Sequence, residues 1–150
     1  MERFKMVLLG LCFSLSGFSA SAQQSDAFNE IENKLSQNPK NIIIKFYTDW
    51  CGICAIQDQK IRKNKQLESM LENDFYFVEF NTESKESIVF HGIRFENKQG
   101  RTHSFAQALL ENPDALPAWV ILNPDYEIIF QYNGLLEPEE LILVLTKIYN

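Results

Sequence analysis

Two cysteines, Cys51 and Cys54, stand two residues apart in a chain that contains only three. They enclose Gly52 and Ile53 in the stretch FYTDWCGICAIQDQ. Such a pair could form a redox-active disulfide, contribute half of a zinc site, or be two small buried residues. A reactive cysteine has to be a thiolate near neutral pH, whereas the pKa of a free cysteine is about 8.5. The surroundings of the pair therefore decide between these chemistries.

The pair lies at a predicted junction between a strand and a helix. Residues 41–48, NIIIKFYT, form an apolar, β-branched run that predicts a strand buried on both faces. A helix is predicted from about Gly52, so Cys51 would meet unpaired backbone N–H groups and the positive end of the helix dipole, which lower its pKa. Cys54 follows about one helical turn later, within disulfide reach, and should be more buried and less ionised. We therefore expect Cys51 to attack and Cys54 to resolve the mixed disulfide.

The other chemistries fit the sequence less well. A structural zinc ion takes four ligands, and His91 and His103 stand far apart without a finger-like spacing. A papain-like nucleophile would need a base, and no histidine is close to the pair in sequence. Two inert core cysteines are not expected at a strand-to-helix turn. The sequence favours a redox-active disulfide that needs no other cofactor and no metal.

The N-terminal residues have the layout of a secretory signal. Arg3 and Lys5 precede the apolar run Met6–Leu15, and Ala-Ser-Ala ends at Ala22. The run of ten is too short to span a bilayer comfortably, and an uncleaved anchor is the alternative. We expect cleavage near Ala22, removal of Cys12, and a periplasmic or secreted protein of a Gram-negative bacterium. A bridge across two residues constrains the unfolded chain little, so in that oxidising compartment it should serve chemistry rather than stability.

Length and composition predict one globular domain. The 150 residues are 45% hydrophobic and 23% charged, which is typical of a folded protein. We expect residues 1–22 to be the signal peptide and residues 23–150 the domain. Removing the signal changes the formal net charge from −6 to −7. This charge argues against nucleic acid and anionic membrane surfaces as partners, and we expect a soluble monomer with no membrane span.

Hydrophobic periodicity and turn residues predict the order α-β-α-β-insert-α-β-β-α. This order gives a mixed α/β sheet with helices on both faces. The expected elements are a helix capped by Ser25 or Asp26 and ending near 37, a strand at 41–48, a helix at 52–62, a helix capped by Asn64, a strand at 74–81, a hairpin of 88–90 and 93–95 turning at His91-Gly92, a helix at 104–111, strands at 118–124 and 126–133, and a helix from Pro138.

The segment FYTDWCGIC resembles the active-site segment of the thioredoxin superfamily, whose best-known form is W-C-G-P-C. The element order and the proline in ALPAWVILNPD match as well, over roughly residues 42–150. The resemblance implies a thioredoxin fold, with a mixed central sheet flanked by helices and a β-hairpin insert before the strand that follows the cis-proline. It also implies that Cys51 is the nucleophile and Cys54 the resolving thiol.

The resemblance assigns supporting roles too. Trp50 would be the aromatic residue that shields the pair, with an unassigned rim residue as the alternative. A cis peptide between Leu116 and Pro117 would keep backbone polar groups open to a substrate peptide, whereas an ordinary trans proline would not.

Three departures from the family pattern concern the control of the sulfurs. Ile53 replaces the proline between the cysteines, and Lys45 occupies the place of a buried carboxylate that accepts a proton from the resolving thiol. Asp58, one turn after Cys54, could supply that carboxylate, and a similarly placed acid occurs in the C-terminal domain of the bacterial disulfide reductase DsbD. The alternative for Asp58 is a solvated helix face. The stretch 82–116 resembles the hairpin insert of exported thioredoxin-like proteins of Bacteroidetes, and we expect it to border the active-site face.

These features predict an exported thiol-disulfide oxidoreductase that exchanges disulfides with protein substrates. We expect it to act as a reductase, for which a membrane disulfide reductase is one electron donor that the resemblance implies. A disulfide oxidase or isomerase, or a thioredoxin-fold binding or chaperone-like module without turnover, is the alternative. A peroxidase of the same superfamily is disfavoured because Trp50 directly precedes Cys51.

Overall fold

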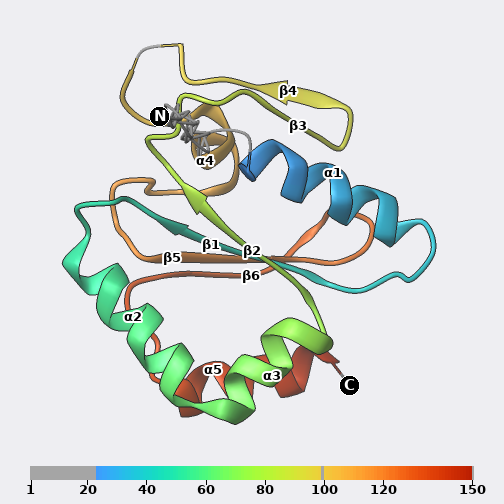
Figure 1. The fold of residues 1–150 in the computed structure, drawn as a ribbon, viewed down its shortest axis with the longest axis vertical. Coiled ribbons are helices and arrows are strands. Elements are labelled where there is room, and N and C mark those ends of the chain that lie inside the picture. Colours follow the sequence, from blue (N-terminus) through green and yellow to red (C-terminus); the bar gives the residue numbers. More distant parts are fainter. Residues whose placement is uncertain (1–22, 99, 150) are drawn as a thin grey trace, which may run out of the picture.

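A central sheet of four strands organises the chain (Figure 1). The computed structural model describes residues 23–98 and 100–149, so the predicted signal peptide, its cleavage site and Cys12 lie outside the described residues. The helices are α1 (Gln23–Leu35), α2 (Gly52–Lys63), α3 (Lys65–Asn73), α4 (Ser104–Leu109) and α5 (Pro138–Tyr149). The strands are β1 (Ile42–Tyr47), β2 (Tyr76–Asn81), β3 (Ile88–Phe90), β4 (Ile93–Phe95), β5 (Ala118–Leu122) and β6 (Ile128–Asn133).

The strand order is β2-β1-β5-β6, with β3 and β4 forming a separate hairpin. Strands β1 and β2 are parallel, whereas β1 pairs antiparallel with β5, and β5 with β6. This is the predicted mixed α/β architecture of the thioredoxin fold, with the predicted hairpin as an addition. Within the described ranges, no helix is long and apolar enough to cross a membrane.

Strand β1 is buried on both faces because a hydrophobic cluster covers each of them. On one face Ile42, Ile44 and Phe46 pack with Phe28 of α1, with the hairpin and with α4. On the other face Ile43 packs with apolar residues of α2, α3 and α5. Helices therefore cover both sides of the sheet (Figure 1). Because both faces of β1 are packed, the end of this strand, from which the cysteine segment continues, is held in place.

Several predicted boundaries were wrong. Ser25 and Asp26 do not cap α1 but lie inside it, and the Ser25 hydroxyl instead donates to Glu86 at 2.6 Å. Strand β6 begins at Ile128 rather than at Tyr126, because Tyr126 has a φ of +65° and belongs to the preceding turn. Helix α4 ends at Leu109, two residues earlier than predicted. Asn64, in contrast, caps α3 as predicted, with its side chain accepting from the Leu67 N–H at 3.0 Å.

The hairpin turns at His91 and Gly92, which have positive φ values of 52° and 71°, as predicted. The His91 ring lies 4.1 Å from the ring of Tyr126. Tyr126 follows the end of β5 that pairs with Ile42, whereas the cysteine segment follows the opposite end of β1. The tip of the hairpin therefore packs at the far end of the sheet, whereas Glu83, near the start of the 82–116 insert, contacts Trp50 beside the cysteines.

Candidate functional site

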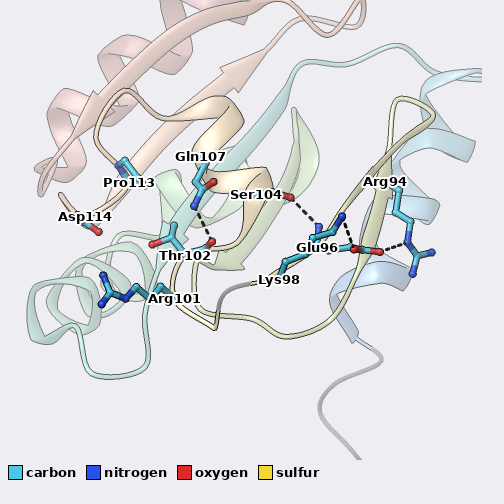
Figure 2. Close-up of a pocket in the computed structure, with 9 residues that line it drawn as sticks. All are labelled: Arg94, Glu96, Lys98, Arg101, Thr102, Ser104, Gln107, Pro113 and Asp114. Atoms are coloured by element: carbon cyan, nitrogen blue, oxygen red, sulfur yellow. Dashed lines mark hydrogen bonds and ion pairs between the residues drawn. The ribbon is translucent and has the colours of Figure 1, made fainter.

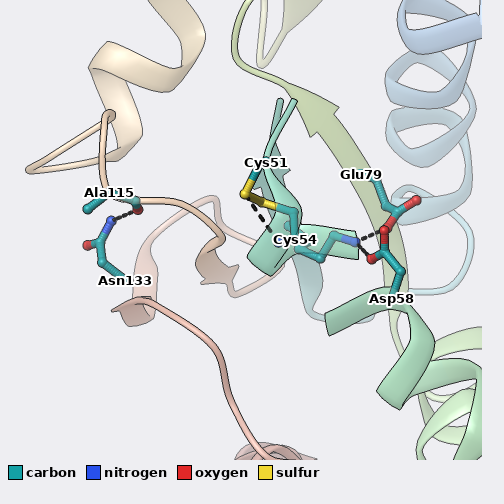
Figure 3. Close-up of a disulfide and its surroundings, with 7 residues drawn as sticks. Cys51, Cys54, Asp58, Glu79, Ala115 and Asn133 are labelled. Atoms are coloured by element: carbon teal, nitrogen blue, oxygen red, sulfur yellow. Dashed lines mark hydrogen bonds and ion pairs between the residues drawn. A yellow bond between two sulfur atoms is a disulfide. The ribbon is translucent and has the colours of Figure 1, made fainter. Parts of the chain in front are cut away.

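Cys51 and Cys54 are joined by a disulfide at the start of α2, with their Cα atoms 5.2 Å apart (Figure 3). Cys51 is the N-cap of this helix, and its sulfur accepts the backbone N–H of Cys54 at 3.1 Å. Cys54 is buried, with 2% of its surface exposed, whereas Cys51 is only half-buried. In the reduced protein the same N–H group and the helix N-terminus would stabilise a thiolate on Cys51, the sulfur that a substrate can reach.

Apolar side chains lie open around the disulfide. Trp50 is 72% exposed, and its indole N–H donates to a Glu83 carboxylate oxygen at 3.1 Å. Ile53 and Ile56 on α2 are also exposed. Gly52 is open to solvent, since a Cβ at this position would contact nothing within 4 Å. Trp50 therefore presents its ring to solvent, with its orientation fixed by Glu83, and together with Ile53 it offers a surface for another chain.

A loop with a cis peptide lies at the same end of the sheet as the disulfide, because Ala118 pairs with Phe46. The bond between Leu116 and Pro117 is cis, as the resemblance implies. The Pro117 carbonyl accepts the Gly134 N–H at 2.7 Å, and the Asn133 side chain donates to the Ala115 carbonyl at 2.8 Å. Figure 3 shows Ala115 and Asn133 on one side of the cysteine pair. Among the described residues, no group bonds to the backbone N–H or C=O of Leu116, which is half-buried.

A buried charge cluster lies on the other side of the pair. Lys45 is fully buried, and its ammonium forms ion pairs with Asp58 and Glu79 (Figure 3). Burial lowers the pKa of Lys45, and the Glu79 carboxylate partly offsets that effect. Asp58 stands one turn after Cys54 on α2, but it is bound to Lys45. Its carboxylate is therefore paired within the fold, with 28% of the side chain exposed, rather than lying fully solvated on the helix surface.

The sequence did not reveal two residues of this site, Glu79 and Glu83. A signal for Glu79 was present, because Lys45 and Glu79 occupy paired positions on two adjacent strands that both read as buried. A charge in each of two such strands indicates a pair. Nothing in the sequence links Glu83 to Trp50, since that contact joins two loops 33 residues apart.

Gln57 holds the cysteine helix against the C-terminal part of the chain. This buried side chain accepts the Leu136 N–H at 2.8 Å and donates to the Leu136 carbonyl at 3.0 Å. One amide thus satisfies both backbone groups of a buried residue that precedes α5. The contact fixes α2, and with it the position of Cys54.

The two histidines have structural roles elsewhere. The Nδ1 of His103 accepts the Phe105 N–H at 3.1 Å at the start of α4, and its Nε2 lies 2.9 Å from the Glu86 carbonyl. A single neutral tautomer satisfies both contacts, and burial lowers the pKa of this imidazole. His91 packs on Tyr126. Within the part of the chain that the structure describes, no group of three or more histidine, cysteine or acidic residues is placed to hold a metal ion.

A hollow of about 750 Å³ lies within the 82–116 insert, lined by residues of the segments 94–107 and 113–114 (Figure 2). Its walls carry both signs of charge, including Arg94, Glu96 and Asp114. Glu96 is paired with Arg94 at 2.7 Å and with Lys98 at 3.6 Å. Neither cysteine is among the residues that line this hollow, so it is not part of the redox pair.

Comparisons with known proteins agree with this geometry. The solved structures that the chain resembles include a disulphide isomerase from Xylella fastidiosa Temecula1, with a TM-score of 0.62 at 16% identity over 89% of this chain and 97% of that one. A thioredoxin from Thermus thermophilus has a TM-score of 0.56 at 14% identity, over 79% and 82% of the two chains. The oxidised C-terminal domain of DsbD from Neisseria meningitidis has a TM-score of 0.55 at 15% identity, over 79% and 90%.

At these identities the structural similarities show the fold alone. The family model for a thioredoxin-like domain matches residues 28–149, which is most of the chain and includes both cysteines. The chain therefore belongs to the family of thioredoxin-like domains.

Proposed function

We propose that this protein exchanges disulfides with protein substrates through Cys51 and Cys54, and that it acts as a reductase. The observation that carries the proposal is the asymmetry of the disulfide. Cys51 is accessible and accepts a backbone hydrogen bond at the N-terminus of α2, whereas Cys54 is buried behind it. A pair arranged in this way can accept a substrate sulfur on one side only.

The exchange would proceed in two balanced steps from the dithiol form. The Cys51 thiolate attacks one sulfur of a substrate disulfide, which forms a mixed disulfide and releases one substrate thiolate. Cys54 then loses its proton and attacks the Cys51 sulfur, which closes the observed disulfide and releases the second substrate thiolate. Two electrons pass to the substrate, which takes up two protons, and a donor dithiol regenerates the enzyme.

The surroundings of the pair support a polypeptide substrate. The unpaired N–H and C=O groups of Leu116 can form strand-like hydrogen bonds with a peptide next to its disulfide. Trp50 and Ile53 supply exposed apolar surface beside Cys51. A small thiol would need neither feature.

Export and direction complete the proposal. The basic start, apolar run and Ala-Ser-Ala of residues 1–22 favour a signal peptide and a periplasmic or secreted protein. In that compartment a reductase needs a supply of electrons, and a membrane disulfide reductase is the donor class that we propose. Reduction is preferred to isomerisation because the segment YTDWCGIC resembles that of reductase-type domains.

Trapping tests the exchange itself. In the Cys54→Ser protein the reduced Cys51 should form a stable mixed disulfide with a substrate such as oxidised insulin, visible as an adduct by mass spectrometry. The Cys51→Ser protein is the matched control and should form no adduct. If neither adduct formation nor insulin reduction with a dithiol donor is seen, the binding-module alternative replaces this proposal.

The reduction potential tests the direction. Equilibration with glutathione should give a potential near the value of about −270 mV that is typical of thioredoxin. A value near that of the oxidase DsbA, about −120 mV, would contradict the reductase proposal while leaving the exchange chemistry intact.

A further inference from the structure

Within the described residues, the sheet has an open edge at β2. Strand β2 is the last strand on its side of the described sheet, where it pairs only with β1. The Tyr76 and Thr82 N–H groups bond to carbonyls at the two ends of β1. In a parallel pair, alternate residues face the neighbouring strand, so Phe77 and Glu79 direct their backbone N–H and C=O groups away from the sheet. In the described part of the chain these four groups have no hydrogen-bond partner.

A groove of about 970 Å³ follows this edge. Phe77, Val78 and Glu79 line it along the strand, and Ala27 of α1 closes one side. It extends to Asp49, two residues before Cys51, and to Glu83. Because Glu83 holds the Trp50 indole at 3.1 Å, the groove reaches the rim of the redox site.

Acidic residues dominate the groove. Among the described residues, its lining contains Asp49, Glu79, Glu83 and Glu86, against one basic residue, Lys85. The buried Lys45 compensates Glu79. Glu83 and Glu86 accept hydrogen bonds from uncharged donors, the Trp50 indole and the Ser25 hydroxyl, so these contacts bring no basic group to either carboxylate. The groove is thus net negative beside a strand edge with open backbone groups.

We propose that the β2 edge groove, lined by Ala27, Asp49, Phe77, Glu79, Glu83 and Glu86, binds an extended lysine- or arginine-rich segment of the disulfide-bearing substrate as an added strand. The open backbone groups of Phe77 and Glu79 would pair with that segment, and alternate basic side chains would reach the acids. The proposal rests on the proposed function, since it names the class of polypeptide that the enzyme selects. A second copy of this chain is a poor occupant, because two acidic edges repel each other.

Binding can be measured without any redox step. The probes are two cysteine-free peptides of equal length, one a Thr-Lys repeat and the other a Thr-Glu repeat. The protein is expressed from the full-length gene and labelled with ¹⁵N. The Thr-Lys peptide should shift the amide resonances of Phe77 and Glu79 and slow their hydrogen exchange, and added salt should weaken the effect. The proposal would be overturned if both peptides bound equally well or if neither bound. It would also be overturned if the shifted resonances belonged only to amides outside β2, or if this edge bound a second copy of the protein instead.

Kinetics then tests selection during catalysis. The substrates carry the same small disulfide loop, followed by a Thr-Lys or a Thr-Glu tail. At low salt the Thr-Lys substrate should be reduced about tenfold faster, since electrostatic steering accelerates association by factors of about 10 or more. Glu86→Lys should shrink this ratio and Lys85→Glu should enlarge it. Glu139→Lys, an exposed change on α5, is the charge-matched control and should leave the ratio unchanged.

The two proposals fail in different ways. Equal rates for both tails, with normal reduction of insulin, would refute the groove and leave the exchange function standing. Absence of any disulfide reduction would refute the function, while the cysteine-free peptides would still decide whether the groove binds a basic strand.

Discussion

The fully buried Lys45 should destabilise the protein once both of its carboxylate partners are removed. In the structure its ammonium has two partners, Asp58 and Glu79, whose side chains are 28% and 46% exposed. The perturbation is the pair of changes Asp58→Asn and Glu79→Gln, made singly and together. Both preserve side-chain size and remove only charge, so they isolate the ion pairs from packing.

The exposures set the expected magnitudes. Asp58→Asn should cost about 1.5–3 kcal/mol of unfolding free energy, the range for a hydrogen bond to a charged group. Glu79→Gln should cost less than about 1 kcal/mol, because solvent screens a carboxylate that is almost half exposed. The double variant should lose about 3–5 kcal/mol, since it leaves a buried ammonium without a partner. Adding Lys45→Met to the double variant should restore stability to within about 1 kcal/mol of the starting protein.

Urea denaturation of the oxidised protein at pH 7 measures these free energies. Equal slopes among the variants, with the disulfide verified by mass, would show that only stability has changed. The reasoning is refuted if the double variant stays within about 1 kcal/mol of the starting protein, or if Lys45→Met fails to rescue it. If the double variant does not fold at all, the triple variant with Lys45→Met still tests the reasoning, because it should fold with nearly the stability of the starting protein.

Two further predictions concern the buried polar residues that support the site. Burial lowers the pKa of His103, so as the pH falls below 6.5 the unfolded chain takes up a proton before the folded one and stability is lost. The His103→Asn variant keeps a capping side chain without this titration, so its deficit in unfolding free energy should shrink between pH 7 and pH 5; a constant deficit would contradict the assignment. Gln57→Leu leaves two buried backbone groups of Leu136 unpaired and should cost about 2–5 kcal/mol in urea denaturation. A cost below about 1 kcal/mol would mean that water replaces the amide.

Local patterns predicted the elements that carry the cysteines. The uninterrupted apolar run of β1 indicated a strand covered on both faces, and two separate hydrophobic clusters cover it. The cap at Asn64 and the hairpin turn at His91-Gly92 were also predicted correctly, because each depends on a few consecutive residues. The cap at Ser25 or Asp26 was wrong because helical residues precede both, and the side-chain partner of Ser25 is 61 residues away.

The sequence alone predicted that Cys51 and Cys54 form a pair within disulfide reach at the start of a helix, and the structure joins them by a disulfide. The spacing of the pair and its position between a buried strand and a helix are local properties, so the order of action of Cys51 and Cys54 could be inferred without coordinates. Only the tertiary structure decided which groups surround the sulfurs. Lys45 meets Asp58 and Glu79 from two other elements, and Trp50 meets Glu83 across 33 residues, because the pairing of β1 with β2 places them together. The open β2 edge also depends on the tertiary structure. Long-range packing selects the strand order, and this order leaves β2 outermost in the described sheet.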